Sequence, residues 1–321
     1  MLCAVQDWTR THFQNMLSRR NVRIKLMQVL YANHDQSDQQ LANCRKAFQV
    51  LIDRSHGLLL QHLLIVQRTA EYAKQDEARR SAKHLPTDAD KAFTAKLATN
   101  PVIVSLGTDH SLRRLYDRFK TGSTVDAEQI RKLYRAFLKT ETYTQYLAEQ
   151  QEDNQAHIAV LLAMYKWLQG QELFQTMVED HFPLYEENKS LTIGALKKII
   201  KSLPAQEDTF SILDSPTESV EEFGRPLLDY VIDADEQLLA RVRPVLQNWD
   251  SERVARIDMI LIKMALGEFL RFTKIPTSVS LNEYVEISKS YSTDKSKEFI
   301  NGVLDKLLKQ LQSEGLVTKE G

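Results

Sequence analysis

Cysteine, glycine and proline are all scarce in this chain of 321 residues, which has two, ten and eight of them. Cys3 and Cys44 form no CxxC motif, which excludes a disulfide framework and a cysteine-built zinc site and fits a reducing cytoplasm. Few glycines and prolines, with little alternation of β-branched residues, predict an all-α chain. No run of 18 apolar residues occurs, so we expect no membrane span.

The chain also lacks a large excess of charge and the common catalytic motifs. Its formal charge of −1 excludes a protein covered in cations, so any nucleic-acid site must be local. Neither GxxxxGK[ST], GxGxxG, GxSxG nor HExxH is found, and the eight histidines are scattered. We therefore expect no catalytic residue, no metal and no cofactor, and a protein that is not an enzyme.

The first distinctive stretch begins at Ser18 and has the pattern of a helix with one apolar side. Between residues 9 and 25 there are five cations and no acid, namely Arg10, Arg19, Arg20, Arg23 and Lys25. A guanidinium holds a phosphate as a fork or stacks on a base, which suits single-stranded RNA. The alternative is an ordinary solvated helix face.

A second distinctive stretch covers residues 275–306, IPTSVSLNEYVEISKSYSTDKSKEFINGVLDK, where two helical patterns meet at residues 290–293. Ser280 and Glu283 have the spacing of a capping box, and Thr293 is the expected N-cap of the second helix. Gly302 follows Asn301 in the middle of that helix, where glycine is costly, so we expect either a close approach to its backbone or a use of the asparagine.

The joint between these two helices combines an aromatic side chain with cations. These residues are Lys289, Tyr291, Lys295 and Lys297. Spacing alone favours a solvated loop with a half-buried tyrosine, and the alternative is a surface that suits RNA.

The middle of the chain also reads as helical. We predict a long helix over residues 41–75 and further helical units that begin near Asp109, Asp126 and Asp153. Residues 205–240 contain ten acids and one cation, Arg225, and we predict an exposed acidic connector over 204–222. The acidic run is either a solvated face, a dock for a basic partner or a strip that repels RNA.

Three blocks of sequence resemble the bacterial transcription antitermination factor NusB family. They are residues 275–306, residues 18–31 (SRRNVRIKLMQVLY), and the pair 248–253 and 257–269 (NWDSER and IDMILIKMALGEF). The resemblance implies a helical bundle that binds boxA-type single-stranded RNA together with NusE, a small-subunit ribosomal protein. It places RNA contacts at Arg19, Arg20, Arg23, Gln28, Lys289, Tyr291 and Lys295. Asn21 stands where the family often has arginine, which reduces the charge of this helix.

The expected architecture is a NusB-like bundle with a large helical insertion after its first helix. The predicted parts are a loose extension at 1–15, bundle segments at 16–40 and 223–312, an insertion at 41–203, the connector at 204–222 and a tail at 313–321. The expected function is cytoplasmic assembly of the antitermination complex on RNA polymerase, for ribosomal RNA operons. The alternative is a helical protein-interaction scaffold with residual or no RNA binding. The sequence leaves open the partner of the insertion, self-association and whether translation starts at Met1 or Met16.

Overall fold

The structure is a computed structural model, which describes residues 17–33, 40–149, 153–183, 185–214, 217–246 and 254–317. All regular elements in these ranges are helical, which confirms the predicted all-α class. The chain forms two compact units, each treated separately below. Residues Ile52–Ser215 belong to one, here called the middle unit, and Leu17–Leu51 joins Pro216–Gly321 in the other, the split unit. The predicted extension at 1–15 lies outside the described residues.

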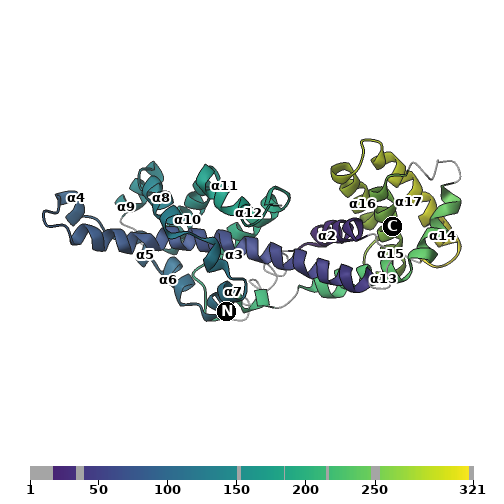
Figure 1. The fold of residues 1–321 in the computed structure, drawn as a ribbon, viewed down its shortest axis with the longest axis horizontal. Helices are drawn as coiled ribbons and strands as arrows, with labels where there is room; N and C mark the ends of the chain where they lie inside the picture. Colours follow the sequence, from purple (N-terminus) through teal and green to yellow (C-terminus); the bar gives the residue numbers. More distant parts are fainter. Residues whose placement is uncertain are drawn as a thin grey trace. The chain divides into compact units, whose positions relative to one another are not determined.

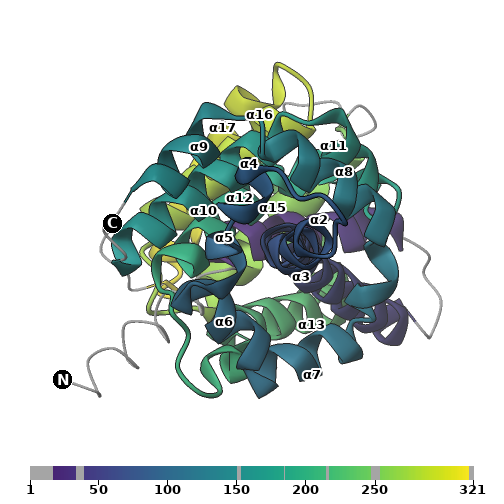
Figure 2. The same ribbon diagram turned by 90° about the vertical axis from the view of Figure 1, so that its left-hand side faces the viewer.

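The middle unit is a set of helices that pack around α3 (Gln40–Ser81), whose residues from Ile52 onward belong to it. Viewed along α3, the helices α6, α7, α8 and α10 are distributed around it (Figure 2). Its other elements are α4 (Asp88–Lys91), α5 (Lys96–Thr99), α6 (Pro101–Thr108), α7 (His110–Arg118), η1 (Thr121–Thr124), α8 (Ala127–Phe137), α9 (Glu141–Ala148), α10 (Asn154–Gln169), α11 (Glu172–Glu179), α12 (Tyr185–Lys201) and η2 (Thr209–Asp214) (Figure 1).

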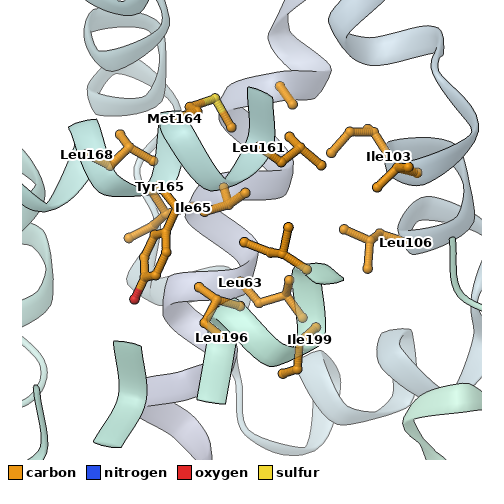
Figure 3. Packing of buried hydrophobic residues seen from close by; sticks show 14 of the residues in the cluster. Leu63, Ile65, Ile103, Leu106, Leu161, Met164, Tyr165, Leu168, Leu196 and Ile199 are labelled. Atoms are coloured by element: carbon orange, nitrogen blue, oxygen red, sulfur yellow. The ribbon is translucent and has the colours of Figure 1, made fainter. Parts of the chain in front are cut away.

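The predicted starts of three of these helices are confirmed. Asp109, Asp126 and Asp153 are the N-caps of α7, α8 and α10, and each side chain accepts a hydrogen bond from a backbone N–H of the first turn. Their apolar faces close one core, in which Leu63 and Ile65 of α3 meet Leu161, Met164 and Leu168 of α10 (Figure 3). Burial of these side chains supplies the main stabilisation of the unit.

The split unit is built around α15 (Arg256–Arg271), which is buried on most sides as predicted. Around it pack α2 (Arg19–Ala32), α13 (Arg225–Asp233), α14 (Asp235–Val245), α16 (Thr277–Tyr291) and α17 (Ser296–Ser313) (Figure 1). A π-helical turn, η3 (Ser219–Gly224), packs against α2 and continues into α13. The motif at residues 248–253 lies outside the described residues.

Residues 204–214, which lie in the predicted acidic connector, are only partly exposed. Phe210 and Leu213 are buried, and the backbone is held by side chains of the middle unit. Three N–H groups donate to these side chains: Ala205 to Ser105 Oγ at 2.8 Å, Thr209 to Asp109 Oδ2 at 3.1 Å and Phe210 to Ser111 Oγ at 3.0 Å. These bonds satisfy backbone N–H groups and hold the segment against the middle unit.

The acidic run at 205–240 is largely matched by cations of the same chain. Six of its ten acids form ion pairs: Asp208 with Arg114, Asp214 with Arg118, Glu218 with Arg19, Glu221 with Arg225, Asp229 with Arg45 and Asp235 with Lys263. Each of these six acids therefore has a cation of the same chain within 4.0 Å.

Candidate nucleic-acid interface

The arginine-rich helix α2 begins at its predicted position. Ser18 is the N-cap, and its Oγ accepts from the Asn21 N–H at 3.4 Å and from Asn21 Nδ2 at 2.9 Å. Val22, Leu26 and Val29 are buried, which turns one side of α2 toward α15 and η3. The remaining face carries Arg19 and Arg20.

Arg23 lies in the core rather than on this face. Its side chain is 3% exposed, and it pairs with the fully buried carboxylate of Glu268 in α15. Arg23 Nε donates to Glu268 Oε2 at 2.9 Å, and Nη2 donates to Oε1 at 2.5 Å. Its guanidinium carbon also lies 5.0 Å from the centre of the Phe223 ring and 5.6 Å from that of Tyr284. This enclosure, with Nε and Nη2 bonded to Glu268, argues against the expected contact of Arg23 with RNA.

Glu268 is the centre of this buried polar group. Besides Arg23, it accepts from Ser280 Oγ at 2.5 Å and from Tyr284 OH at 2.9 Å, both on α16. Burial raises the pKa of Tyr284 well above its ordinary value, so the phenol stays a donor. The carboxylate thus joins α2, α15 and α16.

The predicted capping box at Ser280 is wrong. Helix α16 begins at Thr277, with Pro276 as its N-cap, so Ser280 lies inside the helix. Its hydroxyl bonds to Glu268 instead of to a backbone amide. Glu283 also points elsewhere, toward the arginines of α2.

Arg19 and Arg20 are the exposed cations of α2, with side chains 46% and 43% exposed. Arg19 Nη2 lies 3.7 Å from Glu218 Oε1, and its guanidinium carbon lies 6.0 Å from the centre of the Phe223 ring. Arg20 Nη1 lies 3.7 Å from Glu283 Oε2. Both pairs are longer than a hydrogen bond, so these guanidinium groups keep donors for a ligand.

The joint between α16 and α17 is held by hydroxyl groups around a buried carboxylate of α15. Ser296 Oγ donates to Asp258 Oδ2 at 2.7 Å and lies 2.9 Å from Ser292 Oγ and 2.8 Å from Thr293 Oγ1. Lys295, not Thr293, is the N-cap of α17, which corrects the second predicted cap. Asp258 thereby fixes the turn that carries Tyr291 and Lys295.

The predicted residues of the joint lie on either side of this turn. Lys289 is in the last turn of α16 and forms an ion pair with Glu286, Tyr291 is half-buried at the end of α16, and Lys295 is exposed. Gln28 is half-buried in the second half of α2.

One carboxylate connects the two predicted regions. The pKa of Glu286 is lowered first by the hydrogen bond from Lys289 and then by the charges of Lys289, Arg20 and Lys297. Arg20 of α2 and Lys289 of α16 thus pair with acids one turn apart on α16, Glu283 and Glu286. That the first helix and the joint share an RNA site stays a prediction.

Sequence reasoning missed the acids of this region. Glu268 gave a signal, because a charged residue within the apolar run 264–270 must be paired if it is buried. Glu283 and Glu286 gave none, since acids on a helix are usually solvated. No cluster of histidine, cysteine and acidic residues in the described ranges could hold a metal ion. Within those same ranges, no helix is both long and apolar enough to cross a membrane.

Comparison with known proteins gives a family match at residues 186–309, described as the NusB family. The match covers α12 to α17 but not α2, so Arg19 and Arg20 lie outside it. The search of solved structures returned no match.

Curated relatives match the same protein type. The transcription antitermination protein NusB of Chloroherpeton thalassium is 30% identical over 123 residues, 38% of this chain and 51% of that protein. The protein of the same description from Enterococcus faecalis is 45% identical over 67 residues, 21% of this chain and 44% of that protein. The match thus spans about half of the length of these two relatives. The transcription antitermination protein NusB of Salinibacter ruber is 32% identical over 138 residues, which are 40% of this chain and 86% of that protein. Because this relative is matched over most of its length, the chain belongs to the NusB family.

Proposed function

We propose that this protein is a transcription antitermination factor that binds boxA-type single-stranded RNA together with NusE. The protein, the RNA and NusE would together assemble on RNA polymerase during elongation, at ribosomal RNA operons. Its family membership supports the antitermination role. The observation that carries the RNA site is that Arg20 of α2 and Lys289 of α16, both exposed, lie against neighbouring acids of α16, Glu283 and Glu286.

The proposed mechanism is assembly and not catalysis. Arg19 and Arg20 hold phosphates, since both are exposed and neither is fixed by a short hydrogen bond. Tyr291 offers a ring for stacking on a base, while Lys289 and Lys295 add charge beside it. Gln28 remains a candidate for a polar contact. Arg23 takes no part in contact but fixes α2 against α15 and α16.

The test is fluorescence anisotropy of a labelled boxA-like RNA titrated with the protein, with and without NusE. A scrambled RNA of the same length and composition is the control, and a salt series measures the number of phosphates neutralised. Preferential binding of the boxA-like RNA that tightens with NusE is the expected result. Equal and weak binding of both RNAs, unchanged by NusE, would contradict the proposal.

A second candidate function is a protein-interaction scaffold without RNA binding. It is favoured by the pairing of cations with acids, since Arg19, Arg20 and Lys289 each have a carboxylate within 4.0 Å. Absence of binding to either RNA, with retained binding to NusE, would select this function.

A further inference from the structure

Two exposed cations of the candidate interface lie against carboxylates. Neither family membership nor the proposed function gives these carboxylates a role. Glu283 lies at Arg20, and Glu286 lies at Lys289. We propose that Glu283 and Glu286 compete with RNA phosphates for Arg20 and Lys289 and so weaken the binding of RNA that offers phosphates alone. The inference rests on the proposed function, because it assigns these acids a role in the same RNA surface.

Glu283 is a carboxylate in a fixed position. Its Oε2 lies 3.7 Å from Arg20 Nη1 and 3.8 Å from Nη1 of the buried Arg23. That oxygen is shielded from solvent, yet it has no hydrogen-bond partner within the described part of the chain. Attraction to two guanidinium groups holds Glu283 in place, and Arg23 cannot leave because Glu268 binds it. A phosphate that reaches Arg20 must therefore approach a negative charge that does not move away.

Glu286 is the second acid, and it is exposed beside Lys289. Its side chain is 46% exposed, and it forms an ion pair with Lys289, whose side chain is 40% exposed. The hydrogen bond from Lys289 keeps the pKa of Glu286 below its ordinary value, and the charges of Lys289, Arg20 and Lys297 add to this effect. Glu286 is thus ionised at neutral pH, and a phosphate at Lys289 must displace it.

These acids would affect different RNAs unequally. An RNA that contributes only phosphates gains little, because each new contact replaces an existing contact with a carboxylate. An RNA that also stacks a base on Tyr291 gains a contact that does not use Arg20 or Lys289. The two acids therefore favour RNAs that use both kinds of contact, which is discrimination by a repulsive element.

The test compares Glu283→Gln, Glu286→Gln and the double variant with the wild type in anisotropy titrations. The probes are a labelled oligo(U), which offers phosphates with weakly stacking bases and no boxA sequence, and the boxA-like RNA. Glu236→Gln is the matched control, because it makes the same change of charge at an exposed position of α14. Glu286→Gln keeps the test valid if Glu283→Gln perturbs folding, since Glu286 is a surface residue.

We expect each glutamine variant to bind oligo(U) about two- to fivefold more tightly at low salt, with a steeper salt dependence. The ratio of boxA-like to oligo(U) affinity should fall, and Glu236→Gln should leave both affinities nearly unchanged. If the variants bind oligo(U) no more tightly than Glu236→Gln does, the inference is overturned. In that case the proposed function still stands, provided that the wild type prefers the boxA-like RNA. Tighter oligo(U) binding by the variants without any wild-type boxA preference would support the inference and refute the proposed function.

Discussion

Arg23 and Glu268 are 245 positions apart in the chain and meet through two hydrogen bonds, at 2.9 and 2.5 Å, inside the split unit. The contact joins α2 to α15, and Ser280 and Tyr284 extend it to α16. It therefore fixes the position of the helix that carries Arg19 and Arg20. A buried pair of this kind contributes positional accuracy even where its net contribution to stability is small.

Removal of one partner of this pair should destabilise the split unit. Arg23→Ala leaves the Glu268 carboxylate buried without its cation, which typically costs about 3–5 kcal/mol. Urea unfolding followed by circular dichroism measures the change, and hydrogen exchange of peptides from α15 locates it. Arg20→Ala is the matched control, because its exposed pair with Glu283 contributes at most about 1 kcal/mol. Equal stabilities of the two variants would contradict a structural role for Arg23.

RNA binding should respond to Arg20 without a change in stability. We expect Arg20→Ala to weaken binding of the boxA-like RNA by about 1 kcal/mol, or roughly fivefold, at low salt. The slope of log affinity against log salt should fall by roughly 0.7, the value for one phosphate of a single strand. Anisotropy titrations give both numbers, with Arg113→Ala in the middle unit as the control at an exposed arginine. An unchanged salt slope would remove Arg20 from the proposed phosphate contacts.

The contrast between Arg20 and Arg23 shows what the sequence can and cannot provide. Periodicity predicted α2, the central helix α15 and the aspartate caps of three helices, because these depend on residues close together in the chain. Which arginine of α2 is buried depends on Glu268, which is distant in sequence. The same limit explains the wrong cap at Ser280, because its hydroxyl donates to Glu268 of α15 and not to a group of its own first turn.

The predicted division of the chain shows a similar limit. The compact split unit takes in Leu17–Leu51 and Pro216–Gly321, whereas the family match begins at residue 186 within α12. Helix α12 packs in the core of the middle unit through Leu196, Ile199 and Ile200. The assignment of 41–203 as an insertion, with bundle segments at 16–40 and 223–312, therefore stays a prediction.

The turn between α16 and α17 should depend on Asp258. Replacement by alanine removes the carboxylate that accepts from Ser296 at 2.7 Å, with an expected loss of about 1–3 kcal/mol. Because Tyr291 and Lys295 flank this turn, binding of the boxA-like RNA should also weaken, and Asp258→Asn should restore part of it through its remaining acceptor. Asp305→Ala, at a surface pair with Lys309, is the control. Unimpaired RNA binding by a folded Asp258→Ala protein would exclude the joint from the site.

A buried histidine should make the middle unit sensitive to mild acid. His62 is fully enclosed by Tyr165, Phe174 and Tyr185, and burial lowers its pKa to about 3. Its ordinary value is about 6.5, so between pH 6.5 and pH 3 the unfolded chain binds a proton that the folded chain does not. Stability therefore falls by about 1.4 kcal/mol for each pH unit below 6.5 and is unaffected by this group above it.

Comparison of urea unfolding at pH 7.5 and pH 5.5 tests this dependence. In His62→Gln the loss between the two values should be smaller than in the wild type by about 1.4 kcal/mol. His84→Gln changes an exposed histidine and serves as the control. The prediction fails if His62→Gln retains the full pH dependence of the wild type.

Two glycines of the split unit should respond oppositely to alanine. A Cβ on Gly224, in η3, would lie 2.7 Å from Val22 Cγ1 and 2.9 Å from Phe48 Cζ, so alanine should push η3 away from α2 and cost about 1–3 kcal/mol. Among the described residues, a Cβ on Gly302, in the middle of α17, would meet nothing within 4 Å. The close approach that we expected at Gly302 is therefore not made by the described part of the chain, and alanine should stabilise the protein by up to about 1 kcal/mol.

Urea unfolding of Gly224→Ala and Gly302→Ala measures both changes against the wild type. The same variants test why a costly glycine stands in α17, because a macromolecule that approaches its backbone would be hindered by the added methyl group. Weaker NusE or RNA binding by a stabilised Gly302→Ala protein would place that contact at α17. Destabilisation by Gly302→Ala would instead contradict the open surroundings of this glycine, since a helix interior in open space favours alanine.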